Sequence, residues 1–374
     1  MSRSARTAAR RAQRARRRRV WVATGAGVVV LVLVAGWLAT RGSSGDDEPA
    51  AVRTPARTTA PSTTVTTAPS VTTTAPAPVA TTAPAAPDPA GPPYAVGVGH
   101  VTLEDADRGT VARGPTPASA SRTLPVTVRY PASGAAGTEA DAAVAASGRF
   151  PLVVFAHGYD ISAADYAAFL RDLAAEGFVV VAPDFPRSST VFPGPPTQAD
   201  IDEQARDVGF LVEHFGAGSE GGGATGPWQG HVANGEAGVV GHSDGGNTVA
   251  RAASNSCCIQ TRIGAAAVLS GDEGTSGGQW GVAGSPPMLF VQGTADSINP
   301  WSLSQALYDD AASPKTIVAI DGADHLTPYT SGGQRGAVVA LVAAFLRARL
   351  VDPAALGQVA DRANRDGLRL VASS

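Results

Sequence analysis

Short apolar runs alternate with longer segments of helical periodicity over most of the chain after about Tyr94. The run 151–156 is continuously apolar and ends at His157 and Gly158, a pattern typical of a strand buried on both faces. The segment 162–176 has its large apolar residues at helical spacing and is predicted to be a helix. The same reasoning predicts strands at 96–103, 123–130, 151–156, 178–182, 237–241, 264–269, 288–292 and 316–320, and helices at 162–176, 198–215, 245–254, 301–311 and 333–350. Strands that alternate with helices predict an α/β fold, with a mostly parallel sheet and helices on both of its faces.

The N-terminal region contains an apolar segment with the length of a membrane span. Residues 20–39 carry no charge, and twenty residues of helix reach about 30 Å, the thickness of a bilayer's hydrocarbon core. Residues 1–19 carry nine arginines, which favours a cytoplasmic N-terminus. We therefore expect a basic cytoplasmic segment, then a single transmembrane helix or signal anchor, with the rest of the chain outside the cytoplasm. A cleaved export signal, which would give a secreted protein, is the alternative.

Residues 40–93 have the composition of a solvated linker. They consist largely of Ala, Pro, Thr, Ser and Val and offer little large apolar surface to offset the entropy lost on ordering. This segment is predicted to be a disordered linker, followed by a catalytic domain of α/β type at 94–350. We expect residues 351–374 to be a C-terminal tail that forms one more helix or frays.

Charge and cysteine content narrow the function classes. The formal net charge is -3, but ten arginines lie in the first 41 residues, so the remainder holds 19 basic against 32 acidic residues. An acidic body argues against nucleic acid as a partner. With only two cysteines, Cys257 and Cys258, the chain has no disulfide framework. Four states are open to this adjacent pair: a vicinal disulfide, two reduced thiols, a bridge to another chain, or plain apolar packing in the interior. No metal-ligand spacing is present, and we expect neither a metal nor a cofactor.

One motif has the spacing of a catalytic serine turn. Residues 241–245 read G-H-S-D-G, directly after the predicted strand 237–241 and before the predicted helix 245–254. In that context G-x-S-x-G forms a sharp turn that exposes the serine, here Ser243, and its glycines avoid side-chain clashes. The helix N-terminus behind Ser243 adds partial positive charge where an oxyanion would develop. A plain glycine-rich turn is the alternative interpretation.

A nucleophilic serine needs a base, and the base needs an acid to orient it. Downstream of Ser243, the sequence contains a single histidine, His325, which follows the predicted strand 316–320. Asp296 follows the preceding strand and is the expected acid, with Asp272 as the alternative. Asp324 is adjacent to His325 in sequence, and we expect it to have a local role in the loop.

The remaining requirement is a pair of donors for the oxyanion. The backbone N–H of Asp244 follows the nucleophile, and the N–H of Tyr159 lies in the loop after strand 151–156, where the second donor is expected. We expect His157 to stabilise its turn from beneath the site. His242 is likewise expected to support the site without contacting substrate.

These motifs, in this order, resemble the landmarks of α/β-hydrolases, in particular the branch of dienelactone hydrolases, chlorophyllases, platelet-activating-factor acetylhydrolases and cutinase-like polyester hydrolases. The stretches that carry the resemblance are F-A-H-G-Y at 155–159, F-V-V-V-A-P-D at 178–184, G-H-S-D-G-G at 241–246, the loop around Asp296 and G-A-D-H at 322–325. The resemblance covers roughly 120–350. It implies a nucleophile, a base, an acid and two backbone donors: Ser243, His325, Asp296, Tyr159 and Asp244.

The chain also departs from members of that branch. Polyester hydrolases usually have Met where Asp244 stands and Trp soon after the next strand, whereas Trp280 comes late in the stretch 270–280. Dienelactone hydrolases proper use a cysteine nucleophile, which disfavours their substrate class. Five aromatic residues in or beside loops after strands are candidates for lining a substrate pocket: Phe185, Phe192, Trp280, Trp301 and Tyr329.

The sequence therefore predicts an exported, membrane-tethered serine hydrolase that cleaves carboxylic esters through an acyl-enzyme. Its expected partners are a small-molecule or lipid ester substrate and, through residues 20–39, a membrane. An acyltransferase or a peptidase with the same triad is one alternative. A non-catalytic module that uses the hydrolase fold for binding is another, because a fold does not fix a function.

Overall fold

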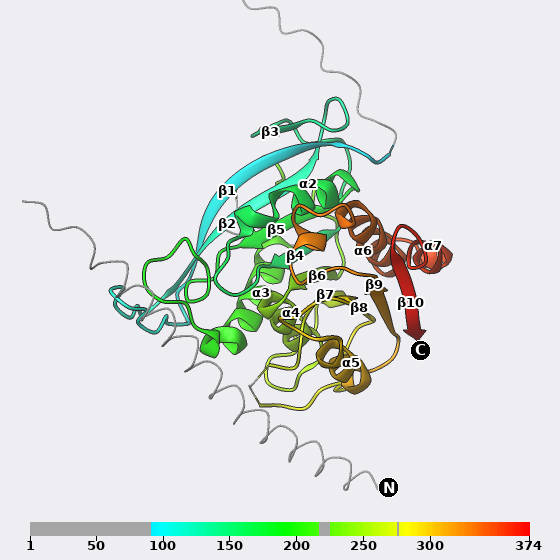
Figure 1. Cartoon of the computed structure of the whole chain (residues 1–374). Helices are drawn as coiled ribbons and strands as arrows, with labels where there is room; N and C mark the ends of the chain where they lie inside the picture. The colour runs from blue at the N-terminus through cyan, green and yellow to red at the C-terminus, as the bar shows by residue number, and fades with distance from the viewer. Residues whose placement is uncertain (1–90, 217–224, 275–276) are drawn as a thin grey trace, which may run out of the picture. The chain divides into compact units, whose positions relative to one another are not determined.

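The computed structural model describes residues 91–216, 225–274 and 277–374 (Figure 1). The predicted segments 1–19 and 20–39, and nearly all of the predicted linker 40–93, lie outside the described residues. Within the described ranges, no helix combines the length and the apolar character that crossing a membrane requires.

Ten strands of the described residues form one sheet, in the order β10-β9-β8-β7-β6-β4-β5-β2-β1-β3 (Figure 1). They are β1 (Ala95–Asp105), β2 (Arg122–Ala132), β3 (Glu139–Asp141), β4 (Leu152–Ala156), β5 (Val179–Pro183), β6 (Ala237–His242), β7 (Ile263–Leu269), β8 (Met288–Gly293), β9 (Lys315–Ile320) and β10 (Leu368–Ser373). Strands β4 to β9 pair in parallel. The long strands β1 and β2 pair with each other antiparallel and join the sheet through an antiparallel β2–β5 pair.

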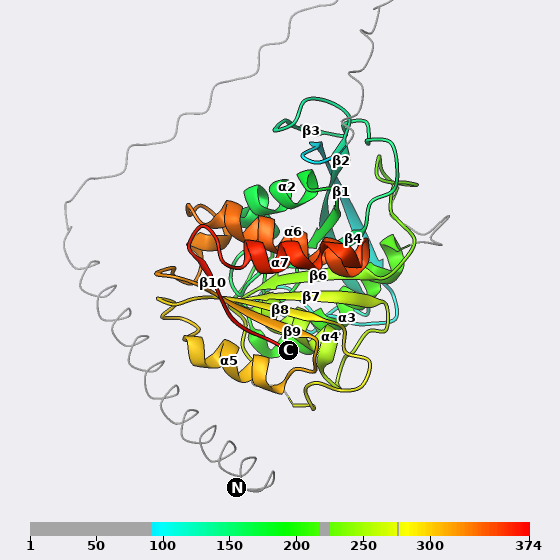
Figure 2. The ribbon, with the colours of Figure 1, turned by 90° about the vertical axis from the view of Figure 1, so that its right-hand side faces the viewer.

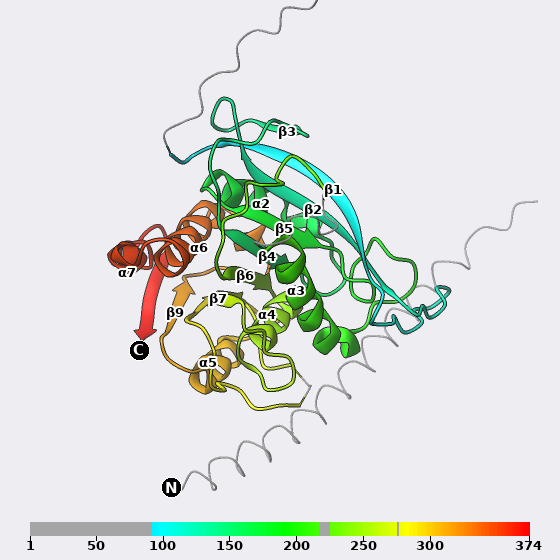
Figure 3. The same ribbon diagram turned by 180° about the vertical axis from the view of Figure 1, so that it is seen from behind.

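Helices cover both faces of the sheet. They are α2 (Ala167–Ala175), α3 (Ile201–Phe215), α4 (Asp244–Ser254), α5 (Trp301–Asp310), α6 (Arg335–Leu350) and α7 (Leu356–Arg362), with the 3-10 turns η1 (Ala163–Tyr166), η2 (Gln198–Asp200), η3 (Thr327–Tyr329) and η4 (Pro353–Ala355). One buried cluster joins α2, α6 and α7 to the sheet, and a second joins α3, α4 and α5 to its other face (Figures 2 and 3). The prediction of a mostly parallel sheet with flanking helices is confirmed.

The order in which the chain adds strands to the sheet reverses in its middle, between β4 and β6. The chain runs from β4 to β5 through α2 on one face, and then from β5 to β6 on the other side of β4 through α3 on the opposite face. Connections that leave β4 and β6 toward opposite faces separate at the carboxyl ends of these strands, and ligands of α/β proteins bind at such points. The loops after β4 and β6 are those for which the sequence predicts an oxyanion donor and a nucleophile.

The residues after Val351 form more than the expected extra helix. Helix α7 follows, and strand β10 then pairs antiparallel with β9 at the edge of the sheet. Strand β10 alternates between less and more exposed positions, with Leu368 5% exposed, as an edge strand with one covered face does. The sheet therefore continues beyond the domain boundary predicted at residue 350.

The chain enters this domain at the amino-terminal ends of the parallel strands, opposite the loops that follow β4 and β6. The backbone N–H of Tyr94 donates to the carbonyl oxygen of Ala175, at the end of α2. The ring of Tyr94 packs edge-on against Phe150, with centroids 5.3 Å apart, and Phe150 precedes β4. Since β4 and β5 run from this end toward Ala156 and Pro183, the entry point and the loops after β4 and β6 lie at opposite ends of the parallel strands.

Candidate active site

Ser243 occupies a tight turn between β6 and α4. Its backbone has φ 55° and ψ -122°, a left-handed conformation that non-glycine residues rarely adopt. A Cβ on Gly241 would overlap the carbonyl group of Gly245, and a Cβ on Gly245 would overlap the carbonyl group of Ala156. The glycines of the motif are thus required by close backbone contacts, as the sequence predicts. The turn leaves Ser243 only partly buried.

His325 and Asp296 continue a hydrogen-bonded chain from this serine. His325 Nε2 lies 2.9 Å from Ser243 Oγ, and His325 Nδ1 lies 2.7 Å from Asp296 Oδ2. The serine follows β6, the aspartate follows β8 and the histidine follows β9, so the carboxyl ends of three strands of the sheet supply the three residues. Ser243 and His325 are partly exposed, whereas Asp296 is buried. The structure thus brings together the three residues predicted from the sequence.

Asp296 is held as a carboxylate by groups that the sequence does not reveal. Gln292 Nε2 donates to Oδ2 at 2.8 Å, and the backbone N–H groups of Ile298 and Asn299 donate to Oδ1. Burial by itself raises the pKa of Asp296, but the hydrogen bond and charge of His325 and the two N–H groups outweigh it, so that the pKa lies below the usual range. The carboxylate therefore stays ionised and can orient the imidazole.

The other two aspartates near the site have different partners. Asp272 accepts a hydrogen bond from the N–H of Gly274 and is not bonded to His325, so it is not the acid of this chain of residues. Asp324 accepts hydrogen bonds from the N–H groups of Leu326 and Thr327, the local role in the loop that was expected.

The loop after β4 lies directly against the serine. A Cβ on Gly158 would stand 3.3 Å from Ser243 Cβ. Among the described residues, no acceptor is found for the N–H of Tyr159 or of Asp244. His157 fixes this loop from beneath: Nδ1 lies 2.7 Å from the carbonyl oxygen of Gly158, and Nε2 accepts from the N–H of Phe185. These contacts give His157 the supporting position that the sequence predicts.

The carboxyl group of Asp244 is buried beside the nucleophile. It is 5% exposed, and Oδ1 accepts a hydrogen bond from Gln198 Nε2 at 2.9 Å. Burial raises the pKa of Asp244 to about 6, against the opposing effect of Gln198, and the nearby charge of Asp272 adds to the rise.

The aromatic residues proposed for a pocket divide into two groups. Phe185 and Tyr329 are fully buried, so the prediction that they line a substrate pocket is wrong in this structure. Phe185 packs against the ring of His157, and the Tyr329 hydroxyl bonds to Ser270 and to the carbonyl oxygen of Val291. Both aromatic rings pack in the hydrophobic core.

Phe192, Trp280 and Trp301 are partly exposed. The ring of Trp280 lies 5.2 Å from the guanidinium of Arg251, and Trp301 packs against the core cluster beneath α5. These three remain candidates for contact with a ligand.

Cys257 and Cys258 are joined by a disulfide bond. Asp202 lies close enough for the three side chains to resemble a metal-binding group. The bond removes the thiolates that would bind a metal, because sulfur in a disulfide carries no negative charge.

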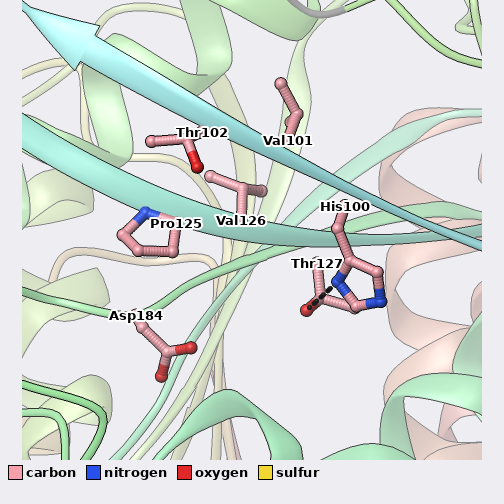
Figure 4. A pocket seen from close by; sticks show the side chains of 7 residues that line it. All are labelled: His100, Val101, Thr102, Pro125, Val126, Thr127 and Asp184. Atoms are coloured by element: carbon pink, nitrogen blue, oxygen red, sulfur yellow. Dashed lines mark hydrogen bonds between the residues drawn. The ribbon is translucent and has the colours of Figure 1, made fainter. Parts of the chain in front are cut away.

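A shallow hollow of about 260 Å³ lies over β1 and β2 (Figure 4). Its lining includes Asp184 and a hydrogen-bonded pair, His100 Nδ1 and Thr127 Oγ1, which lie 3.2 Å apart. None of the predicted site residues lines this hollow.

The chemistry available to this arrangement follows from its geometry. A hydroxyl bonded to an imidazole, with a carboxylate on the second ring nitrogen, permits proton removal from the hydroxyl as it attacks a carbonyl carbon. The N–H groups of Tyr159 and Asp244 belong to the two loops that meet at Ser243.

Comparisons with known proteins agree with this fold. Residues 141–295 match the chlorophyllase family model. Ferulic acid esterase from Streptomyces cinnamoneus is a similar solved structure, with a TM-score of 0.56 and 20% sequence identity over 77% of this chain and 98% of that chain. No curated protein sequence matches the chain. The chain therefore has the α/β-hydrolase fold and resembles the chlorophyllase-like branch of that fold.

Proposed function

We propose that this protein is a serine hydrolase that cleaves carboxylic esters through an acyl-enzyme. The observation that carries the proposal is the hydrogen-bonded chain from the partly exposed Ser243 through His325 to the buried Asp296. The similarity of the fold to a structure named as an esterase supports an ester as the substrate.

Acylation begins when Ser243 Oγ attacks the ester carbonyl carbon and His325 Nε2 takes its proton. Asp296 keeps the other proton of the ring on Nδ1 and stabilises the imidazolium. The N–H groups of Tyr159 and Asp244 donate to the oxyanion, and the N-terminus of α4 adds its partial positive charge. The carbon–oxygen bond to the alcohol then breaks, and His325 returns its proton to the departing alcohol oxygen.

Deacylation repeats these steps with water. His325 Nε2 takes a proton from water while the water oxygen attacks the acyl carbon. The bond to Ser243 Oγ then breaks, His325 returns the proton to Oγ, and the carboxylic acid leaves. If an alcohol replaces water at this stage the product is a new ester, and if the leaving group is an amine the reaction is that of a peptidase.

Covalent labelling and ester turnover test the proposal together. The full chain, a Ser243→Ala variant and a Ser285→Ala control are treated with a fluorophosphonate probe and then assayed with p-nitrophenyl esters from acetate to palmitate. Ser285 is a suitable control because its hydroxyl bonds to the carbonyl oxygen of Val282, away from the site. We expect labelling and turnover in the wild type and the control, and neither in Ser243→Ala. Equal ester turnover by Ser243→Ala would overturn the proposal. A folded wild type with neither signal would favour a non-catalytic binding module.

We also propose that the enzyme works outside the cytoplasm, tethered through residues 20–39. The apolar length of this segment and the nine arginines before it support the proposal. Fractionation of expressing cells tests it: the chain should stay with the membrane after a high-salt wash and be cleaved by protease added to spheroplasts. A shortened, freely released chain in the medium would instead indicate cleavage of an export signal.

A further inference from the structure

His242 contacts the three segments that build the candidate site: the turn of Ser243, the loop of His325 and, through Tyr166, the loop after β4. It is the last residue of β6 and directly precedes Ser243. Its ring packs at a tilt against the rings of His325 and Tyr329, with centroids 4.7 Å apart in each pair. Its Nε2 lies 2.7 Å from the carbonyl oxygen of His325, and its Nδ1 lies 2.7 Å from the hydroxyl of Tyr166.

The partners of His242 fix the direction of every hydrogen bond. A carbonyl oxygen only accepts, so Nε2 must carry the proton that it donates to His325. In the neutral ring Nδ1 then accepts, and the Tyr166 hydroxyl is its donor. The oxygen of Tyr166 in turn accepts from the N–H of Gly158, at 3.3 Å. We call this series, from Gly158 through Tyr166 and His242 to the carbonyl of His325, the Tyr166–His242 relay.

The relay keeps one arrangement of protons while His325 changes its own charge. Burial, with the positive charge of His325 as a second cause, lowers the pKa of His242 to about 3. Burial also raises the pKa of Tyr166 above the usual range, so its hydroxyl stays protonated. His242 therefore stays neutral, and protonation of His325 leaves the donors and acceptors of the relay unchanged.

We propose that Tyr166 and His242 are positioning residues for the ester hydrolysis proposed above, on which this inference rests. The relay joins the loop of the oxyanion donor Tyr159 to the loop of the base His325, through the residue next to the nucleophile. Its hydrogen bonds set how far Gly158 stands from Ser243 and where the main chain of His325 lies. Displacements of about 1 Å in such groups lower rates by roughly 100-fold, so the relay acts on catalysis without touching substrate.

Tyr166→Phe is the most direct test, because it removes only a hydroxyl. The phenyl ring can keep its packing against Phe155, whose centroid lies 4.9 Å away. The matched control is Tyr130→Phe: Tyr130 is also fully buried, and its hydroxyl donates a single hydrogen bond, to the carbonyl oxygen of Ala143. In the full chain, we expect Tyr166→Phe to lower kcat about 10-fold with KM unchanged, and to slow fluorophosphonate labelling similarly. Tyr130→Phe should keep the wild-type kcat.

His242 allows a second test by partial rescue. His242→Gln retains an N–H that can reach the carbonyl oxygen of His325, whereas His242→Leu retains none. We expect the Gln variant to keep about 10-fold more kcat than the Leu variant. In histidine ¹⁵N spectra, the Nδ1 resonance of His242 should indicate an unprotonated acceptor in the wild type. It should move in Tyr166→Phe and not in Tyr130→Phe.

The outcomes separate this inference from the proposed function. If the wild type is labelled by fluorophosphonate but Tyr166→Phe matches it in kcat and labelling rate, the relay is not a positioning device and the serine hydrolase stands. A loss confined to the melting temperature, with kcat and the Nδ1 resonance unchanged, also overturns the relay. If the folded wild type shows neither labelling nor turnover, the proposed function and the catalytic role of the relay fail together.

Discussion

The Cα of Gly245 packs against the carbonyl oxygen of Ala156, so closely that a Cβ at Gly245 would overlap that oxygen. Ala156 is the last residue of β4, and Gly245 is in the first turn of α4. This contact holds the carboxyl end of β4 against the first turn of α4. It brings the loop that begins at His157 within reach of Ser243.

Gly245→Ala should therefore destabilise the protein strongly. The backbone must move to admit a methyl group, and overpacking of this kind costs about 1–3 kcal/mol or more. Gly336→Ala in α6 is the control, because a Cβ there meets nothing within 4 Å and alanine favours a helix by about 1 kcal/mol. Urea unfolding should show a large loss for Gly245→Ala and none for Gly336→Ala. Equal stability of the two variants would contradict the contact.

Asp296→Asn should lower kcat by roughly 10³-fold or more with little change in fold. An amide nitrogen facing His325 Nδ1 favours the wrong tautomer, in which Nε2 is protonated and cannot take the serine proton. Gln305→Ala, on the exposed side of α5, is the control. Steady-state turnover and circular dichroism check both. A variant with most of the wild-type kcat would show that Asp296 does not orient the base.

Asp244→Asn should stabilise the protein at neutral pH. Because the pKa of Asp244 is raised to about 6 from an ordinary value near 3.8, the folded state binds this proton more tightly than the unfolded state. The resulting stabilisation is present below about pH 4 and is lost as the pH rises through 6, a change of about 3 kcal/mol. Gln198 can still donate to the amide oxygen of the variant.

The measurement for Asp244 is the difference in unfolding free energy between the variant and the wild type at pH 4, 5, 6 and 7. Using the difference removes the contribution of His242, whose pKa burial lowers. The difference should grow in favour of the variant with pH. A difference that is flat across this range would show that the carboxyl group titrates as it does in water.

Arg122 should contribute strongly to stability because it is fully buried between two carboxylates. Its Nε bonds to both oxygens of Asp207, and its Nη2 lies 2.6 Å from Asp200 Oδ2, which ties β2 to the start of α3. Arg122→Met removes the fully buried cation from these carboxylates and leaves Asp207 to Arg108 and Asp200 to Arg187. Breaking a buried ion pair in this way typically costs about 3–5 kcal/mol.

Arg369→Ala is the matched control for Arg122→Met, since its ion pair with Asp321 is exposed to solvent and contributes little to stability. Thermal unfolding of both variants checks the contrast. Equal shifts in Tm would mean that the buried ion pairs of Arg122 contribute no more to stability than the exposed pair of Arg369.

The fold was predictable where burial dictates an unambiguous pattern. Strand β4 is apolar throughout, and β6 carries no polar side chain before its last residue, His242, because both faces of these strands are covered. Their alternation with helices along the chain implies the parallel sheet. Strand β10 was missed because only alternate residues are covered, which leaves a weak signal at an edge. Strand β3 has three exposed residues and no apolar pattern at all.

The site was predictable where chemistry restricts the choice. The flanking glycines identify Ser243, and His325 is the single histidine that follows Ser243 in the sequence. No sequence motif identifies the supporting residues Gln292 and Tyr166, because their roles depend on which loops the fold brings together. Phe185 and Tyr329 were misassigned for the same reason: an aromatic residue after a strand has the same spacing whether it faces a ligand or the core.

The entry of the chain at Tyr94 has a practical consequence for attaching this protein to a support. Because Tyr94 joins the domain beside Phe150 and Ala175, at the far end of the parallel strands, a linkage made through the N-terminal side leaves the face with Ser243 directed outward. Enzyme coupled to a resin or an electrode in this way should retain access to bulky substrates. Random coupling through carboxylates would block access to Ser243 in some of the molecules, since Asp160 and Asp324 are exposed in loops of the candidate site.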